Sequence, residues 1–189
     1  MTRFDARRRA ALLAAAAAAA SAALPAWATR AGEDGQVIDL KVDLAMKRLK
    51  QNVAGASELL ERAKGVLVTP DVTEASFLLG GAYGEGALRL NGATVAFYSL
   101  AKGSFGFQAG AQKFDQALFF MTTSALERFR RSEGWELEAE AEVTTPEDGL
   151  VAALDTTTSR NPVISVTWGQ TGLLAGVSLG GAKFTRIKR

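Results

Sequence analysis

The most distinctive pattern of the chain is a long stretch in which short apolar runs alternate with glycine-rich breaks. It covers residues 75–111 and contains almost no charge. Short apolar runs bounded by glycine are typical of β-strands that fold back on one another. Asn91-Gly92, between two such runs, is a strong signal for a two-residue hairpin turn. The pattern therefore predicts an antiparallel sheet in the middle of the chain.

A helical period precedes this stretch. Between residues 37 and 53 the apolar positions recur every three or four residues, which predicts an amphipathic helix. Its expected apolar face, which Met46 widens, consists of Ile38, Val42, Ala45, Leu49 and Val53.

Two shorter helices are also predicted. The first covers residues 57–64, with Ser57 as its N-cap and Gly65 as its stop signal. The second covers residues 124–130 and begins at Ser124 as its cap.

Further strands are expected on both sides of the glycine-rich stretch. Residues 135–143 alternate strictly between apolar and acidic side chains, which predicts one half-buried strand. The C-terminal part reads as a β-meander with Gly169 and Gly180-Gly181 at its turns. Other short strands are predicted at residues 66–68, 77–80, 87–90, 94–98, 105–111, 117–121, 163–168, 173–179 and 183–187.

The predicted elements define a fold class. We expect an α+β fold in which short N-terminal helices pack on a strongly curled or barrel-like, mainly antiparallel sheet of about eight strands. The expected domain organisation is a signal peptide at residues 1–28, a flexible leader at 29–36 and a single domain at 37–189.

The signal peptide is predicted from its three parts. Arg3 and Arg7 to Arg9 form a basic region, an uncharged Ala-rich segment follows at residues 10–24, and Ala26-Trp27-Ala28 suits cleavage after Ala28. The apolar segment is too short to span a bilayer as a helix. The paired arginines fit a twin-arginine signal, and general secretory export stays open as the alternative. We therefore expect an exported protein, periplasmic or peripheral to a membrane.

Charge and composition narrow the classes of function. The chain has 22 basic and 20 acidic residues, and residues 1–28 contain four Arg and one Asp, so the remaining chain has 18 basic and 19 acidic residues, a net charge of −1. A general nucleic-acid-binding role is not expected from that balance. The basic residues nevertheless form local groups early in the chain, at 128–131 and at 183–189, so an anionic partner would have to meet a local patch.

The chain lacks the residue types of most common catalytic sites, and nothing in the sequence singles out the carboxylates that remain. The chain has no His and no Cys, which removes the serine triad, thiolate sites and most zinc or iron sites. Carboxylate pairs such as Glu74 with Glu85, or Asp115 with Glu127, remain as candidates that nothing in their spacing selects. The glutamates at 136, 138, 140 and 142 would share one exposed strand face, an ordinary solvated edge rather than a metal site. We expect no enzyme activity, no cofactor and no metal.

Five segments together resemble one protein family, the SYLF domain. They are LLERAKGVLVTPDV (59–72), GAYGEGALRL (81–90), FYSLAKGSFGFQAGAQ (97–112), LFFMTTSALERF (118–129) and GLLAGVSLGGA (172–182). The resemblance implies a lipid-binding module rather than an enzyme. Eukaryotic relatives bind phosphoinositides, partly through an N-terminal amphipathic helix, and some yeast relatives bind actin filaments. The predicted export argues against both of these partners here.

The helix at residues 37–53 is the leading candidate for lipid contact. We expect its basic side chains to meet anionic phospholipid head groups and its smaller apolar strip to insert shallowly. The expected lipid-binding residues are Lys41, Lys47, Arg48, Lys50, Leu40, Leu44 and Met46. The simpler alternative is that the helix only packs on the sheet while its lysines are solvated. A second alternative is an envelope structural or protein-interaction module without direct lipid affinity.

Overall fold

The computed structural model describes residues 34–136, 142–144, 162–172 and 181–189 of the chain. The predicted signal peptide with its cleavage position, most of the predicted leader, the predicted strand at 173–179 and the glutamates at 138 and 140 lie outside these residues.

The sheet is built around one very long β-hairpin. Its strands, β1 (Gly65–Leu90) and β2 (Ala93–Phe120), pair antiparallel along almost their whole lengths. Asn91 and Gly92 form the turn with φ angles of 51° and 82°. Positive φ at both positions is what a type I′ turn requires, and Asn-Gly is its preferred sequence. The predicted hairpin turn is confirmed.

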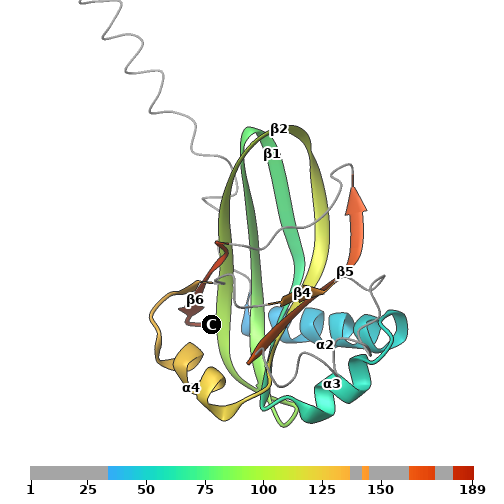
Figure 1. Ribbon diagram of the computed structural model, residues 1–189, viewed down its shortest axis with the longest axis vertical. Helices are drawn as coiled ribbons and strands as arrows, with labels where there is room; N and C mark the ends of the chain where they lie inside the picture. Colours follow the sequence, from blue (N-terminus) through green and yellow to red (C-terminus); the bar gives the residue numbers. More distant parts are fainter. Residues whose placement is uncertain (1–33, 137–141, 145–161, 173–180) are drawn as a thin grey trace, which may run out of the picture. The chain divides into compact units, whose positions relative to one another are not determined.

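This hairpin is bent double. Figure 1 shows both strands rising from the helices, curving over at the far end and running back. The start of β1 consequently lies beside its end, since a Cβ added to Gly65 would come within 2.5 Å of the Leu90 side chain. The β1–β2 register shifts between Thr69 and Val72, and again between Ser76 and Leu78. Such irregularities bend a strand without ending it, so the short runs predicted separately are segments of two continuous strands.

Two glycines of the returning half allow the two halves of β1 to meet. A Cβ on Gly86 would overlap the carbonyl oxygen of Val68, and one on Gly84 would lie 2.9 Å from the methyl group of Thr69. Only a residue without a side chain permits backbones to approach so closely. At these positions the glycine-rich stretch therefore has a packing role.

Four shorter strands complete the described sheet. β5 (Val163–Gly172) pairs with the end of β2, and β6 (Lys183–Ile187) pairs with residues 97–101 of β2. β3 (Trp135–Glu136) adds to β6, whereas β4 (Glu142–Thr144) adds to β5 in parallel. The strand order is β3-β6-β2-β5-β4, and β1 pairs with β2 off this path. The α+β class and the curled, mainly antiparallel sheet are confirmed, with six strands in the described residues.

The predicted strand over residues 135–143 is described only at its two ends, because residues 137–141 lie outside the described residues. Its start forms β3 beside β6, and its end belongs to β4 beside β5. The ring of Trp135 packs against Phe120, Phe129 and Phe184, which attaches the start to β6.

Gly169 lies within β5 and not at a turn. Its φ is 67°, and it follows Trp168, where the register between β2 and β5 shifts after Lys113. Gly169 therefore forms part of a bulge that strand β5 passes through.

Three helices flank the described sheet, with caps that differ from those predicted. α2 (Gly35–Asn52) begins two residues early, capped by the side chain of Asp34, so Gly35 and Gln36 belong to the helix. α3 (Ala56–Arg62) follows Gly55 in the left-handed conformation, and its C-cap is Ala63. α4 (Thr123–Arg131) is capped by Thr122. The predictions of Ser57 and Ser124 as caps and of Gly65 as a stop are wrong, because neighbouring residues fill these roles and Gly65 opens β1.

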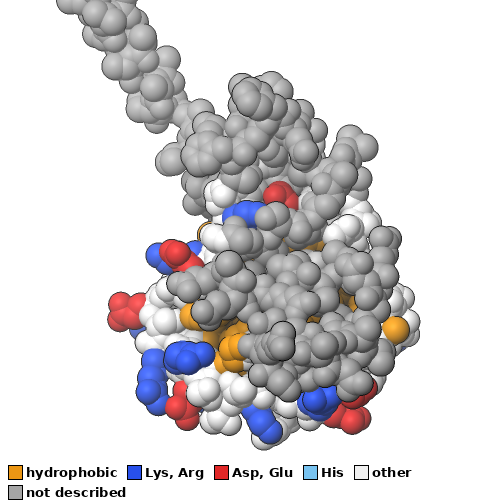
Figure 2. Space-filling view, viewed as in Figure 1, with side chains coloured by type: hydrophobic (Ala, Val, Ile, Leu, Met, Phe, Trp, Pro, Cys, Tyr) orange, Lys and Arg blue, Asp and Glu red, His pale blue; other side chains and the backbone are white. Residues whose placement is uncertain are grey.

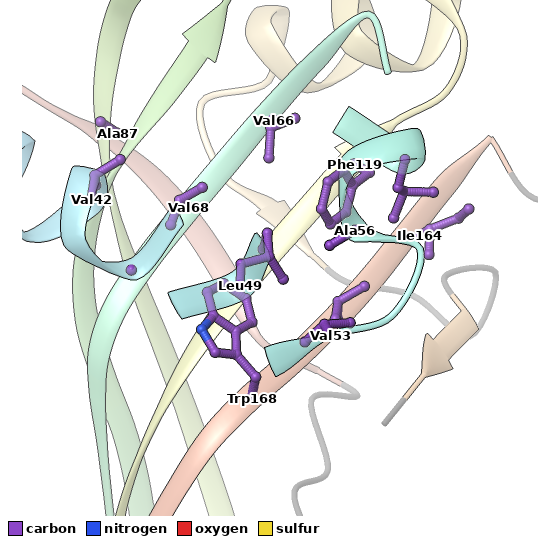
Figure 3. Packing of buried hydrophobic residues seen from close by; sticks show 14 of the residues in the cluster. Val42, Leu49, Val53, Ala56, Val66, Val68, Ala87, Phe119, Ile164 and Trp168 are labelled. Carbon is purple, nitrogen blue, oxygen red and sulfur yellow. The ribbon is translucent and has the colours of Figure 1, made fainter. Parts of the chain in front are cut away.

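Strands buried on both faces divide the interior into two cores. Alternate residues of β1, β2 and β5 point to opposite faces, so Phe119 joins one core while Leu118 and Phe120 join the other. The first core lies under α2 and α3, where Figure 3 shows Leu49 and Val53 packed beside Trp168 and Ile164. The second core includes α4, whose Phe129 lies 4.7 Å from both Tyr98 and Phe120 between ring centroids.

Candidate functional site

Helix α2 is attached to the sheet by one fully buried face. Ile38, Val42, Ala45 and Leu49 are each 0% exposed and belong to the first core. These residues are the apolar face that the sequence predicts. Burying such side chains contributes roughly 1.5–3 kcal/mol for each large one, so the helix is a rigid part of the domain.

One flank of α2 is fixed by an ion pair with the sheet. Nη2 of Arg48 lies 2.7 Å from Oδ2 of Asp115, and Nε of Arg48 donates to the same oxygen at 2.9 Å. Asp115 is 4% exposed, and its other oxygen accepts from the backbone N–H of Asp71 at 3.0 Å. Lys41 adds a longer contact of 3.8 Å to Asp71. This flank therefore brings two of the predicted lipid-binding residues to the sheet.

The other flank is fixed by acidic residues of the helix. Nη2 of Arg89, at the end of β1, contacts Oδ1 of Asp39 at 3.1 Å and Oδ1 of Asp43 at 2.9 Å. The hydroxyl of Thr94 donates to the same Asp39 oxygen at 2.6 Å. Ion pairs on both flanks, together with the buried face, fix which side of α2 points away from the sheet.

That outward side carries an apolar strip. Val37, Leu40 and Leu44 are 43%, 65% and 58% exposed and follow an i, i+3, i+7 spacing, so they lie on one side of the helix. We call these three residues the outer strip. Lys47 continues it one turn later, and Lys50 is also exposed. Neither lysine has an ionic partner within the described part of the chain.

The predicted lipid-binding residues thus divide into two groups. The outward side holds Leu40, Leu44, Lys47 and Lys50. In the second group, Met46 packs against the first core, Arg48 is engaged with Asp115, and Lys41 contacts Asp71. Val37 also belongs with the first group although it is not among the predicted residues; its i+3 and i+7 relation to the two leucines is the sequence signal that identifies it.

Each member of the candidate carboxylate pairs has a partner of its own. Glu74 accepts from Gln112 at 2.7 Å. Glu85 pairs with Arg189 at 2.6 Å and accepts from the hydroxyl of Tyr83 at 2.7 Å. The second pair is likewise divided between different partners, because Asp115 pairs with Arg48 and Glu127 pairs with Arg131.

Among the described residues, no three acidic side chains come together as metal ligands. None of the described helices combines the length and the apolar composition needed to cross a bilayer.

The fold and α2 together define a class of protein: an α+β domain in which a curled sheet carries an amphipathic helix with an exposed outer strip. Comparison with family models identifies it further. The Ysc84 family, described as Las17-binding protein actin regulator, matches residues 80–188, which is more than half of the chain. The chain belongs to this family, whose domain is the SYLF domain. The resemblance found in the sequence is confirmed.

The matched range includes most of the hairpin and all of β2 and α4, whereas α2 precedes it. The family is known for lipid- and actin-regulator-binding roles. A comparison with curated proteins found no match.

Proposed function

We propose that this protein is a non-enzymatic, exported binding protein of the bacterial cell envelope that contacts anionic phospholipid through the outward side of α2. The main observation in support is that the outer strip is exposed although the rest of the helix is fixed by burial and ion pairs. A rigid helix that keeps Leu40 and Leu44 in water favours an apolar partner surface.

Charge next to the outer strip favours an anionic surface over a neutral one. Lys47 and Lys50 are exposed without ionic partners in the described chain, so their ammonium groups are available to head groups. Each contributes up to about 1 kcal/mol close to an anionic membrane. Arg48 and Met46 have a structural role in this proposal, because the ion pair and the core hold them.

The first test is co-sedimentation of the full chain with vesicles of phosphatidylcholine alone or with added phosphatidylglycerol or cardiolipin, at low and high salt. The 29–189 chain is measured alongside, so that the apolar segment at 10–24 cannot account for binding. We expect binding to anionic vesicles only, weakened by salt. Absence of binding to every vesicle would contradict the proposal and favour a protein partner for the outer strip.

Variants assign the binding to α2. We expect Leu40→Ser combined with Leu44→Ser to weaken binding to anionic vesicles by about tenfold or more, since each loses apolar area that the membrane would cover. Lys47→Glu with Lys50→Glu should weaken it similarly and reduce its salt dependence. Val95→Ser and Lys64→Glu change an exposed apolar and an exposed basic residue elsewhere and serve as matched controls. Equal losses in the controls would show that α2 is not the site.

A further inference from the structure

The fold brings together two basic groups that are far apart in the sequence. α4 carries Arg128, Arg130 and Arg131, and β6 with the residues after it carries the basic C-terminal group. Arg186 of β6 is the register partner of Tyr98 on β2. Phe129, next to Arg130, packs on the ring of Tyr98 with centroids 4.7 Å apart. Tyr98 is therefore the point at which α4 and β6 meet.

Tyr98 presents a fixed hydroxyl at this point. The residue is 3% exposed and belongs to the second core, so its ring cannot turn away. No hydrogen-bond partner for the hydroxyl exists among the described residues, and the hydroxyl is not one of the enclosed polar atoms of the core. A buried phenol whose hydroxyl reaches the surface unpaired is ready to bond a ligand from outside.

Two arginines of the adjoining elements lie close to Tyr98, Arg186 as its register partner and Arg130 next to Phe129. Arg130 and Arg186 are both exposed, and neither has an ionic partner in the described residues. Arg131, by contrast, is paired with Glu127 at 2.7 Å. Burial raises the pKa of Tyr98 above its ordinary value, against the opposing effect of Arg186 and Arg130. The phenol therefore stays neutral at physiological pH and can donate its proton in a hydrogen bond.

We infer that Tyr98, Arg130 and Arg186 form a binding site for a phosphate group, on the side of the sheet opposite α2. All three side chains are donors, and a tetrahedral phosphate offers several acceptor oxygens to two guanidinium forks and one hydroxyl at once. Figure 2 shows basic side chains gathered over α4. The phosphate could belong to a free ion or to a lipid head group, and both present the same oxygens. This site is independent of the outer strip.

The test is titration calorimetry of the full chain with inorganic phosphate, and co-sedimentation with phosphatidic acid vesicles with and without added phosphate. We expect Arg130→Gln with Arg186→Gln to weaken phosphate binding by about tenfold or more, since bonds to charged groups are lost. Tyr98→Phe, which keeps the ring and the fold, should weaken it several-fold. Arg128→Gln removes an exposed arginine from the other flank of α4 and should leave binding unchanged.

The arms of the experiment separate the two sources and the two sites. Binding of the free ion identifies a soluble phosphate ligand. The vesicle arm is measured with Leu40→Ser and Leu44→Ser present, so that α2 contributes little, and binding of the vesicles alone that is lost on adding Arg130→Gln with Arg186→Gln identifies a head group. Leu40→Ser with Leu44→Ser should retain phosphate binding, which keeps this inference distinct from the function proposed for α2. Equal weakening by Arg128→Gln, or no binding of either probe, would overturn the inference.

Discussion

At the scale of single residues, Asp115 shows how the sheet prepares a contact for the helix. It lies beside the bulge at Gly169, and the backbone N–H that it accepts comes from Asp71, whose φ is 51°. Two irregular positions of neighbouring strands thus converge on one buried carboxylate. A buried carboxylate is stable only with such partners, so Arg48 completes a set of donors that the sheet begins.

Removing Arg48 should therefore destabilise the domain. We expect Arg48→Met to lower the free energy of unfolding by about 1–3 kcal/mol, because Asp115 stays buried with one of its donors lost. Urea unfolding measures the change. Lys47→Met, one residue earlier but exposed, should stay within about 0.5 kcal/mol. In a double-mutant cycle, Asp115→Asn should recover part of the loss, and strictly additive effects would argue against this pairing.

A second residue-scale prediction concerns alkaline pH. Burial raises the pKa of Tyr98 in the folded state, whereas the unfolded chain has an ordinary tyrosine pKa of about 10. The folded state therefore keeps the phenol proton of Tyr98 to higher pH than the unfolded chain does. The stability that neutral Tyr98 contributes is complete below about pH 10 and is lost as the pH rises beyond it. We expect the unfolding free energy of the wild type to fall relative to that of Tyr98→Phe above about pH 10. Parallel pH profiles of the two proteins would refute this.

At the scale of elements, α2 is the part of the structure that sequence reasoning predicts best. Its buried face follows the 3.6-residue period because only one side of the helix meets the sheet. The same reasoning could not assign Arg48 or Asp39 to ion pairs. Their partners lie 67 and 50 residues away, and only the folded hairpin brings them to the helix. The sequence thus predicts which helix forms the candidate site, but only the fold shows which residues of that helix point outward.

The strands were harder to delimit for a related reason. Residues 65–70 of β1 and 114–120 of β2 are buried on both faces, so these segments show apolar runs without the alternation that marks a strand with one wet face. A glycine-rich break also looks the same in a sequence whether the chain turns there or only bends. Asn91-Gly92 was identifiable because a two-residue turn demands positive φ at both positions.

At the scale of the whole molecule, close packing of the bent hairpin depends on Gly86. We expect Gly86→Ala to destabilise the domain by about 2 kcal/mol or more, because the new methyl group would overlap the Val68 carbonyl and force the two halves of β1 apart. Gly103→Ala is the matched control, since a Cβ there meets nothing within 4 Å. Thermal unfolding compares the two variants. Equal stability of both would contradict a close-packing role for Gly86.

The pairing of β2 with β6 has a consequence for how the protein is made. Residues 97–101 of β2 bond β1 on one edge and β6 on the other, and the contact from Ser99 to Thr185 joins positions 86 residues apart. During synthesis, this edge of β2 has its hairpin partner at once but waits for nearly half of the chain to emerge before β6 can cover it. An open strand edge invites pairing with other chains, so the nascent protein passes through a period in which it needs protection from its neighbours.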